Sequence, residues 1–325
     1  GRTATLNLLE GLVAIDVRNQ YRVFLSQPEP TLISPAGNVT QVISPFKNRF
    51  LQRLWAQIVL PWAVHDCNVL HYVKNLSVFG IRKPEIVTVY DLTTLVYPEL
   101  FPKVDVWYWR HIQKLTLHKA KRIIAISDTT AHDLHQFYGL QPGNIRVVFP
   151  SIHPRFQPAS SMEIDRVRHL YGLPQRFILH VGRIDRKKNL TLLVKVFDHA
   201  RRSCGMDSDF HLVLVGDTAK KSQDEELIPL IDHLGLNNLV LFTGRVPDGD
   251  LPAIYGAARL CVSVSLHEGF GLSAVEALGC GVPLLAYQAA ALQEAVGDAA
   301  LVLDTLDCQV WAESMAHLLS DPDLQ

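Results

Sequence analysis

The second half of the chain alternates short apolar runs with segments of helical periodicity. The apolar runs are rich in Val, Leu and Ile, and the segments between them place apolar residues three or four positions apart. Strands of this kind, separated by helices, are typical of a parallel sheet covered on both faces. From residue 177 onward we therefore predict a doubly wound α/β domain. Its strands are expected at 177–184, 210–217, 239–246, 260–265 and 300–304, and its helices at 189–202, 224–235, 250–258 and 309–319.

The first half repeats this pattern less regularly. A polar, proline-containing stretch near 151–175 separates the halves, and we interpret it as the domain boundary. The predicted fold is thus α/β, with two doubly wound Rossmann-like domains, 1–155 and 156–325, that face each other across a cleft. In the first domain strands are expected at 21–26, 85–91, 122–128 and 145–150, and the clearest helix at 104–122.

Composition narrows the class of protein. The chain is 48% hydrophobic and 19% charged, as in ordinary soluble proteins, and its formal net charge of -1 argues against a nucleic-acid partner. Its five cysteines show no C-x-x-C spacing, which indicates reduced thiols in a cytoplasmic protein. The apolar stretch 54–64 is interrupted by Gln57 and Pro61 and is too short to span a bilayer.

Three polar segments lie at the carboxyl ends of predicted strands of the second domain, at 182–189, 244–250 and 267–273. The first two carry cations, and the third, HEGFGLS, offers backbone amides at a helix start. Ligands of open α/β sheets bind beyond the carboxyl ends of the strands. The pattern therefore predicts a cleft that holds a dianionic leaving group.

Two carboxylates, Glu268 and Glu276, lie on either side of the glycine-rich turn in the third segment. Ser273 and Glu276 form S-x-x-E, so a capping box at the helix start is one interpretation of Glu276. Glu268 has no Lys or Arg within four residues. The amides of Gly271 and Leu272 are expected to be free at the helix N-terminus, which makes an anion site. On spacing alone, the structural and the binding interpretation of Glu276 both stay open.

Two other kinds of site fit the sequence less well. The run from Gly269 to Ala274 reads G-x-G-x-x-A, but the acidic residue that a nicotinamide site needs at the end of the next strand is missing. Three D-x-D strings lie at a strand's wrong end, at a helix start, and in the last residues, so we predict no metal site. A departing diphosphate would then be neutralised by Arg183 and Lys188, with Arg186 and Lys187 as a solvated helix start.

The segment HEGFGLSAVEALGCGVPLLA resembles the E-x7-E signature of retaining glycosyltransferases with the GT-B fold, in the large family 4 that includes mannosyl- and glucosyltransferases. HVGRIDRKKNL is similar to that family's diphosphate segment, and VLFTGRVPDGDLPAIYGAA to its base-contacting segment. VTVYDLTTLVYPELF and RIIAISDTTAHDL resemble its acceptor-side segments. The resemblance implies an acceptor-binding domain at 1–155 and a donor-binding domain at 156–325.

The resemblance also assigns roles to single residues. It implies that Glu276 binds the donor ribose and that Glu268 contacts hydroxyls of the transferred sugar. Arg183 and Lys188 would hold the diphosphate. Further donor contacts are expected at the helix start and beside the base, from Val246, Phe270, Gly271, Leu272 and Ser273.

The sequence departs from the family pattern in two ways. Tyr90 stands before Asp91 where family members carry a histidine, which would weaken catalytic help at that position. The chain opens with residues similar to the segment after the family's first strand, and it ends before the usual closing helix. We therefore expect the first strand of the N-terminal domain to be missing and the chain to be part of a longer polypeptide.

Together these features predict a metal-independent retaining glycosyltransferase without a cofactor. The donor is expected to be a GDP- or UDP-sugar, with mannose from GDP-mannose favoured, and the acceptor a hydroxyl of a glycan, glycolipid or small molecule. The alternatives are a UDP-glucose-type transferase and a catalytically weak sugar-nucleotide-binding subunit. The expected location is the cytoplasm, with the cytoplasmic face of a membrane as a peripheral site.

Overall fold

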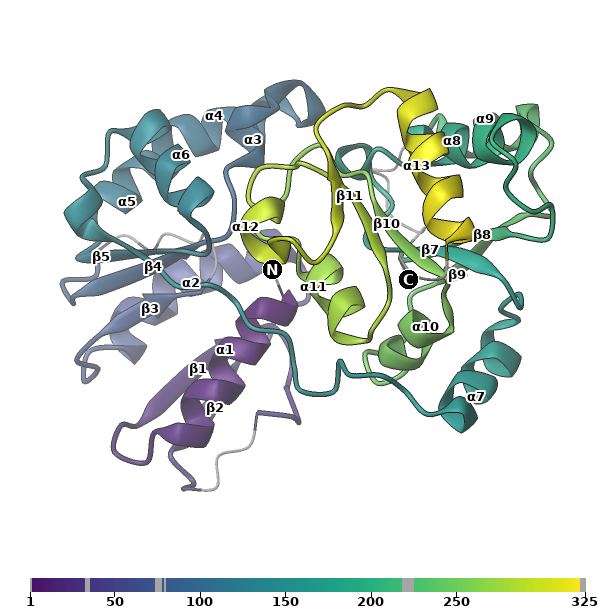
Figure 1. Ribbon diagram of the computed structural model, residues 1–325. Coiled ribbons are helices and arrows are strands. Elements are labelled where there is room, and N and C mark those ends of the chain that lie inside the picture. The colour runs from purple at the N-terminus through teal and green to yellow at the C-terminus, as the bar shows by residue number, and fades with distance from the viewer. Residues whose placement is uncertain (1, 33–35, 74–77, 79, 218–224, 322–325) are drawn as a thin grey trace. The chain divides into compact units, whose positions relative to one another are not determined.

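The computed structural model describes residues 2–32, 36–73, 78, 80–217 and 225–321. The chain divides into two compact units, residues 1–151 and 152–325 (Figure 1). This division lies four positions before the start predicted for the second domain. Each unit is an α/β structure around parallel strands.

The C-terminal unit is built on a parallel sheet of six strands in the part of the chain that the structure describes, in the order β12-β11-β10-β7-β8-β9. The order runs outward in one direction from β7 and in the other from β10, which is the doubly wound arrangement. The switch point of the topology therefore lies between β7 and β10. The strands are β7 (Phe177–Val181), β8 (His211–Val215), β9 (Val240–Gly244), β10 (Leu260–Ser263), β11 (Leu284–Tyr287) and β12 (Leu301–Leu303).

Two separate apolar cores cover the two faces of this sheet, because successive strand residues point to opposite sides. On β7, Ile178 packs in one core with helices α8 and α13, and Leu179 packs in the other with α10 and α11. All five residues of β7 are buried or half-buried, as expected for a central parallel strand. The helices of this unit are α7 (Ser161–Tyr171), α8 (Leu190–Ser203), α9 (Leu227–His233), α10 (Leu251–Ala257), α11 (Leu272–Gly279), α12 (Leu292–Val296) and α13 (Cys308–Ser320).

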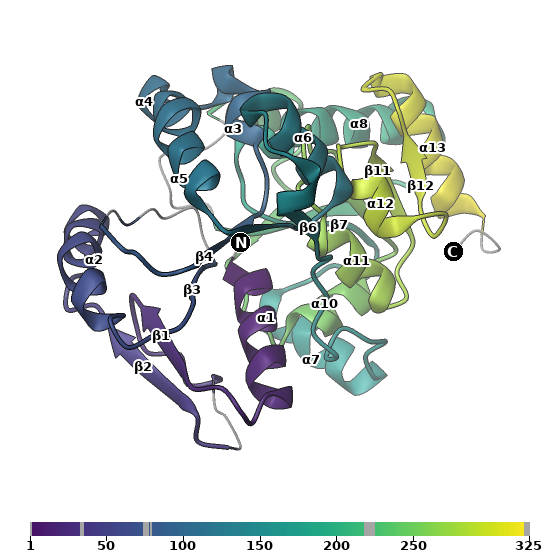
Figure 2. The same cartoon turned by 90° about the vertical axis from the view of Figure 1, so that its left-hand side faces the viewer.

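The N-terminal unit contains a parallel sheet in the order β3-β4-β5-β6 and a separate parallel pair, β1-β2. The predicted strand at 21–26 belongs to that pair and not to the larger sheet. Figures 1 and 2 show α4, α5 and α6 along one face of the larger sheet. The strands are β1 (Tyr21–Leu25), β2 (Val39–Ile43), β3 (Leu70–Tyr72), β4 (Glu85–Val89), β5 (Arg122–Ala125) and β6 (Ile145–Val147). The helices are α1 (Arg2–Ile15), α2 (Arg49–Ala63), α3 (Thr93–Val96), α4 (Lys103–Tyr108), α5 (Lys114–Lys119) and α6 (Asp128–Tyr138).

The helix predicted at 104–122 is interrupted by a π-helical turn, Trp109–Gln113, between α4 and α5. Sequence periodicity did not predict α1, α2, α6 or α7. The last of these falls inside the stretch interpreted as a boundary, and a capping box between Ser160 and Glu163 starts it. Among the described residues, no helix combines the length and the apolar run that a transmembrane span requires.

Candidate functional site

The carboxyl edge of the C-terminal sheet is shaped by two glycines that follow neighbouring strands. Gly182 follows β7 and donates its amide to Val215 O at 2.9 Å, at the end of β8. A Cβ atom on Gly216 would lie 1.8 Å from Gly182 O, which no side chain can occupy. The ends of β7 and β8 therefore approach closely here because Gly216 lacks a side chain. Gly182 has no side chain either, and Lys188 occupies the space beside it. The Cε atom of Lys188 lies 3.3 Å from the position that a Cβ atom on Gly182 would have.

Lys188 and Glu268 form an ion pair at the switch point of the sheet. Lys188 ends a 3-10 turn, Arg186–Lys188, that follows β7, and Glu268 lies in the loop after β10. Lys188 Nζ donates to Glu268 Oε1 at 2.5 Å, and the two side chains are only 14% and 11% exposed. The glutamate that has no cation near it in sequence is thus paired with a lysine eighty positions away.

The charge state of Glu268 follows from this pair. Burial alone would raise the pKa of Glu268, but the charges of Lys188 and Lys187 and the hydrogen bond from Lys188 lower it to about 2. The Lys187 segment is itself fixed, because Leu266 donates its amide to Lys187 O at 2.9 Å. Glu268 is therefore a carboxylate at neutral pH and can accept hydrogen bonds from hydroxyl groups.

Arg183 lies on the same loop and in a different environment. Its side chain is 66% exposed, and Nε is 4.0 Å from Asp185 Oδ2. An exposed arginine loses little solvation where it stands and is able to move toward an anion. The structure thus brings Lys188 and Glu268 together and leaves Arg183 at the rim of the same loop.

The N-terminus of α11 offers amides to a ligand. Gly271 is the N-cap with φ +87°, a conformation that favours glycine, and the cap has no side-chain hydrogen bond. Within the described residues, the amides of Gly271, Leu272 and Ser273 meet no acceptor. Three amides at the positive end of a helix favour an anion. The free amides of Gly271 and Leu272 lie where the sequence predicted them.

Glu276 is not part of a capping box. Because α11 starts at Leu272, Ser273 lies inside the helix, and Glu276 instead accepts a hydrogen bond from Tyr255 Oη at 3.1 Å. Burial raises the pKa of Glu276 to about 7, against the opposing hydrogen bond from Tyr255, and the charge of Asp248 adds to the rise. The capping-box interpretation is therefore wrong. Glu276 is instead a buried carboxyl group whose pKa lies near neutral pH.

Val246 and Phe270, the other two predicted donor contacts, are buried at 4% and 8% exposure. Val246 packs in the core with Ala253 and Leu292, so its side chain serves the fold, and only its backbone could face a ligand. Tyr90 belongs to the N-terminal unit, at the end of β4, where its hydroxyl shares a 2.6 Å hydrogen bond with Thr5. Burial raises the pKa of Tyr90, so the phenol is neutral at pH 7.

Two residues of the site were not predicted from the sequence. Tyr255 holds Glu276, and His180 lies on β7 beneath Lys188 with its Nδ1 3.0 Å from Val262 O. Both looked like core residues in sequence, because each stands in an apolar run. A polar side chain at the carboxyl end of a central strand, as at His180, was the available signal.

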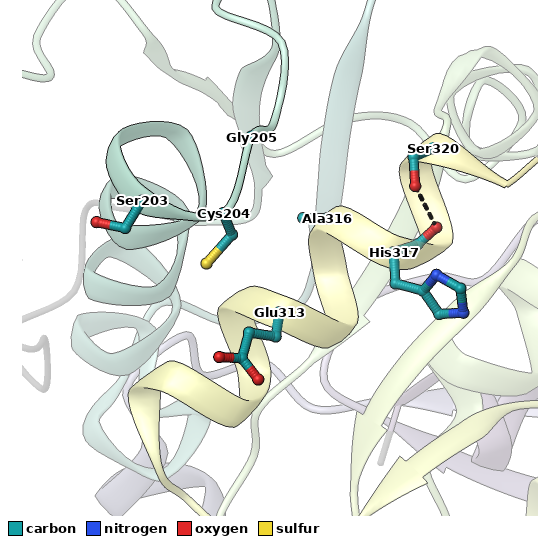
Figure 3. Close-up of a pocket in the computed structure, with 7 residues that line it drawn as sticks. All are labelled: Ser203, Cys204, Gly205, Glu313, Ala316, His317 and Ser320. Atoms are coloured by element: carbon teal, nitrogen blue, oxygen red, sulfur yellow. Dashed lines mark hydrogen bonds between the residues drawn. The ribbon is translucent and has the colours of Figure 1, made fainter.

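A shallow hollow lies elsewhere, between the end of α8 and α13 (Figure 3). It is lined by Ser203, Cys204, Gly205, Glu313, Ala316, His317 and Ser320. The end of α8 leads into the start of β8, so this hollow is at the amino edge of the sheet, away from Lys188 and Glu268. In the described ranges no group of His, Cys, Asp and Glu is arranged to hold a metal ion.

Comparison with known proteins identifies the family of the chain. Residues 161–325 match the family model of glycosyl transferases group 1, and residues 2–156 match that of glycosyltransferase family 4. O-antigen chain mannosyltransferase B of Escherichia coli is 28% identical over 262 residues, which are 80% of this chain and 68% of that protein. D-inositol 3-phosphate glycosyltransferase of Salinispora arenicola is 33% identical over 273 residues, 81% of this chain and 56% of the relative.

Solved structures show the same architecture. HepE of Anabaena, crystallised with UDP and glucose, has a TM-score of 0.77 at 20% identity, over 99% of this chain and 87% of that one. WaaG, a glycosyltransferase of lipopolysaccharide biosynthesis, has a TM-score of 0.72 at 15% identity, over 99% and 88%. The predicted α/β fold of the GT-B class is confirmed by these likenesses. The chain belongs to the glycosyl transferases group 1 family.

Proposed function

We propose that this protein transfers a hexose from a nucleoside-diphosphate sugar to an acceptor hydroxyl, with retention and without a metal ion. The observation that carries the proposal is the Lys188–Glu268 pair beside the amides of α11, at the switch point of a doubly wound sheet. One side of this site offers positive charge and N–H donors, and the other offers a carboxylate. A sugar diphosphate needs both.

The roles follow from the charge states. Lys188, Arg183 and the amides of Gly271 and Leu272 would hold the diphosphate, which leaves with growing negative charge. Glu268, an anion with a lowered pKa, would accept hydrogen bonds from hydroxyls of the transferred sugar. Glu276, behind the helix start, would bind the ribose hydroxyls, and Val246, Phe270 and Ser273 would line the donor.

GDP-mannose is the first donor to test, because a mannosyltransferase is among the relatives. UDP-glucose is the runner-up, since HepE was crystallised with UDP-glucose. The acceptor is proposed as a glycan, glycolipid or small-molecule hydroxyl bound by the N-terminal unit. A weakly catalytic sugar-nucleotide-binding subunit is the second candidate function. The hydrogen bond that engages the Tyr90 hydroxyl with Thr5 favours it, and normal nucleotide affinity without turnover would select it.

Substitution of Lys188 and Arg183 tests whether these cations bind the diphosphate. Lys188→Ala should weaken binding of the matching nucleoside diphosphate by about 1.5–3 kcal/mol, or roughly 10- to 150-fold, through loss of a charged hydrogen bond. Arg183→Ala should also weaken nucleoside-diphosphate binding. Arg186 is an exposed cation in the same loop and serves as the control, so Arg186→Ala should bind the nucleotide like the parent. Titration calorimetry with GDP and UDP, with and without chelator, measures this.

Lys188→Ala also leaves Glu268 buried without its partner, so its stability needs a control. The double variant Lys188→Ala/Glu268→Gln removes that buried charge and should recover stability without recovering nucleotide affinity. Unchanged nucleoside-diphosphate affinity in both cation variants would sink the assignment.

The raised pKa of Glu276 predicts proton release on nucleotide binding. Ribose hydroxyls that donate to this carboxyl favour its charged form, so nucleoside-diphosphate affinity should rise between pH 5 and pH 7. The stability of the free protein should change with pH in the opposite direction to its nucleotide affinity. Because the pKa of Glu276 is raised in the folded state, the free energy of unfolding should fall by roughly 3 kcal/mol as the pH rises from 4.5 to about 7.

Glu276→Gln should remove both dependences, because the amide does not titrate. Calorimetry in buffers of different ionisation enthalpy counts the released proton, and urea unfolding at pH 5 and pH 8 follows the stability. A Glu276→Gln variant with the parent's pH profile for binding would contradict the role of Glu276.

Peripheral association with a membrane surface belongs to the same proposal. In the described segment from α4 to α5 and on to Arg122, Lys119 is paired with Glu85. The other exposed cations of this segment are Lys103, Arg110, Lys114, Lys121 and Arg122, against one acid, Asp105. Val104, Trp107 and Leu115 are 69%, 56% and 63% exposed at helical spacing among them. Apolar and aromatic side chains interleaved with cations fit an anionic lipid surface, where the apolar groups can insert between lipids. A soluble polyanion would need only the cations.

Vesicle sedimentation tests this surface. Lys103→Gln/Arg110→Gln/Lys114→Gln should lose about 1 kcal/mol per cation, roughly 100-fold in all, on vesicles that contain phosphatidylglycerol. Trp107→Gln/Leu115→Gln should also bind less, and Ile228→Gln, which is 53% exposed on α9, should bind like the parent. Equal binding by parent and surface variants, or binding to heparin and not to vesicles, would refute the membrane assignment.

A further inference from the structure

His180 is a buried histidine at the switch point of the C-terminal sheet. It is 2% exposed on β7, and β10 is the strand that pairs with β7 (Figure 1). Its Nδ1 lies 3.0 Å from Val262 O on β10, and because a carbonyl oxygen only accepts, Nδ1 carries the proton. Burial and the charge of Lys188 lower the pKa of His180 to about 4, so the ring is neutral at pH 7. The second ring nitrogen, Nε2, is then an acceptor without a proton.

This acceptor is unused in the structure. Within the described part of the chain, His180 Nε2 is buried and has no hydrogen-bond partner. An unpaired buried acceptor is unfavourable, and an apolar residue like its neighbours Leu179 and Val181 would fill the same strand position without that cost. A buried histidine at this position is therefore best explained if Nε2 accepts a hydrogen bond in another state of the site, when a ligand is bound.

Lys188 is the donor within reach. The position that a Cβ on Gly182 would occupy is 3.1 Å from His180 Nε2 and 3.6 Å from Lys188 Nζ, so the two nitrogens face the same small space. Gly182 has no side chain to fill it. The ammonium of Lys188 has three N–H donors, of which one is given to Glu268. A short movement of the ammonium would bring a second donor to Nε2.

We propose that His180 is a positioning residue for Lys188, whose Nε2 accepts a hydrogen bond from the ammonium when a diphosphate is bound. The inference rests on the proposed function. Bound diphosphate draws Lys188 away from Glu268, and His180 holds the ammonium over the end of β7 during that exchange. Glu268 is thereby released to the hydroxyls of the sugar. No proton is transferred, because the imidazole stays neutral and the ammonium stays charged.

Nitrogen NMR of the parent protein tests this directly. With ¹⁵N-labelled histidine, addition of the nucleoside diphosphate should move the His180 Nε2 resonance in the direction of a hydrogen-bonded acceptor, while Nδ1 keeps its proton. The same addition to Lys188→Ala should leave Nε2 unmoved. A parent Nε2 resonance that does not move on saturation overturns the proposal, whatever the variants of His180 do.

Variants give a second, independent measurement. His180→Phe keeps a ring and removes the acceptor, and it should weaken nucleoside-diphosphate binding about tenfold while binding of the free nucleoside stays as in the parent. His180→Gln retains an acceptor and should recover most of that loss. His211→Phe, at the opposite end of the neighbouring strand β8, is the control and should bind normally.

The outcomes separate this inference from the proposed function. Weakened binding by Lys188→Ala with parent-like binding by His180→Phe would overturn the role of His180 alone. Parent-like binding by both variants would overturn the diphosphate site itself. Should His180→Phe fail to fold, the NMR measurement on the parent decides.

Discussion

The ion pair between Lys188 and Glu268 joins the two halves of the C-terminal sheet where their strand order reverses. Each partner is nearly buried, and a buried charge is tolerated only where an opposite charge meets it. The Lys188 side chain has room because Gly182 lacks a side chain, and Gly216 lets the ends of β7 and β8 approach closely. The N-cap of α11, Gly271, follows Glu268 three residues later, so the charged pair and the free amides of that helix belong to one loop.

The two glutamates of this site occupy opposite electrostatic environments. Glu268 meets a cation, and its pKa falls to about 2, whereas burial raises the pKa of Glu276 to about 7 against the hydrogen bond from Tyr255. One is a permanent acceptor, and the other becomes a better acceptor when hydroxyl donors arrive. Two carboxylates of one short segment can thus act on different parts of one ligand with different pH dependences.

The sequence predicted the features that depend on local pattern. Apolar runs located the strands β7 to β10, and the glycines after β10 predicted the amides of α11. Periodicity could not show that Lys188 faces Glu268, because strand order brings together loops eighty positions apart. The S-x-x-E spacing suggested a capping box for Glu276, but α11 starts at Leu272 with Gly271 as its N-cap, so Ser273 is not the capping residue. His180 was missed because one polar residue in a buried strand resembles core packing.

Amide hydrogen exchange, with and without saturating nucleoside diphosphate, tests most directly whether the carboxyl edge of the C-terminal unit holds that ligand. We expect slower exchange at Gly271, Leu272 and Ser273, because bound phosphate oxygens would accept hydrogen bonds from those amides. Exchange along residues 182–188 should also slow, because the bound ligand would hold that loop in place, and exchange in α13 should not change. Protection confined to other segments, with the α11 amides exchanging as before, would contradict this assignment.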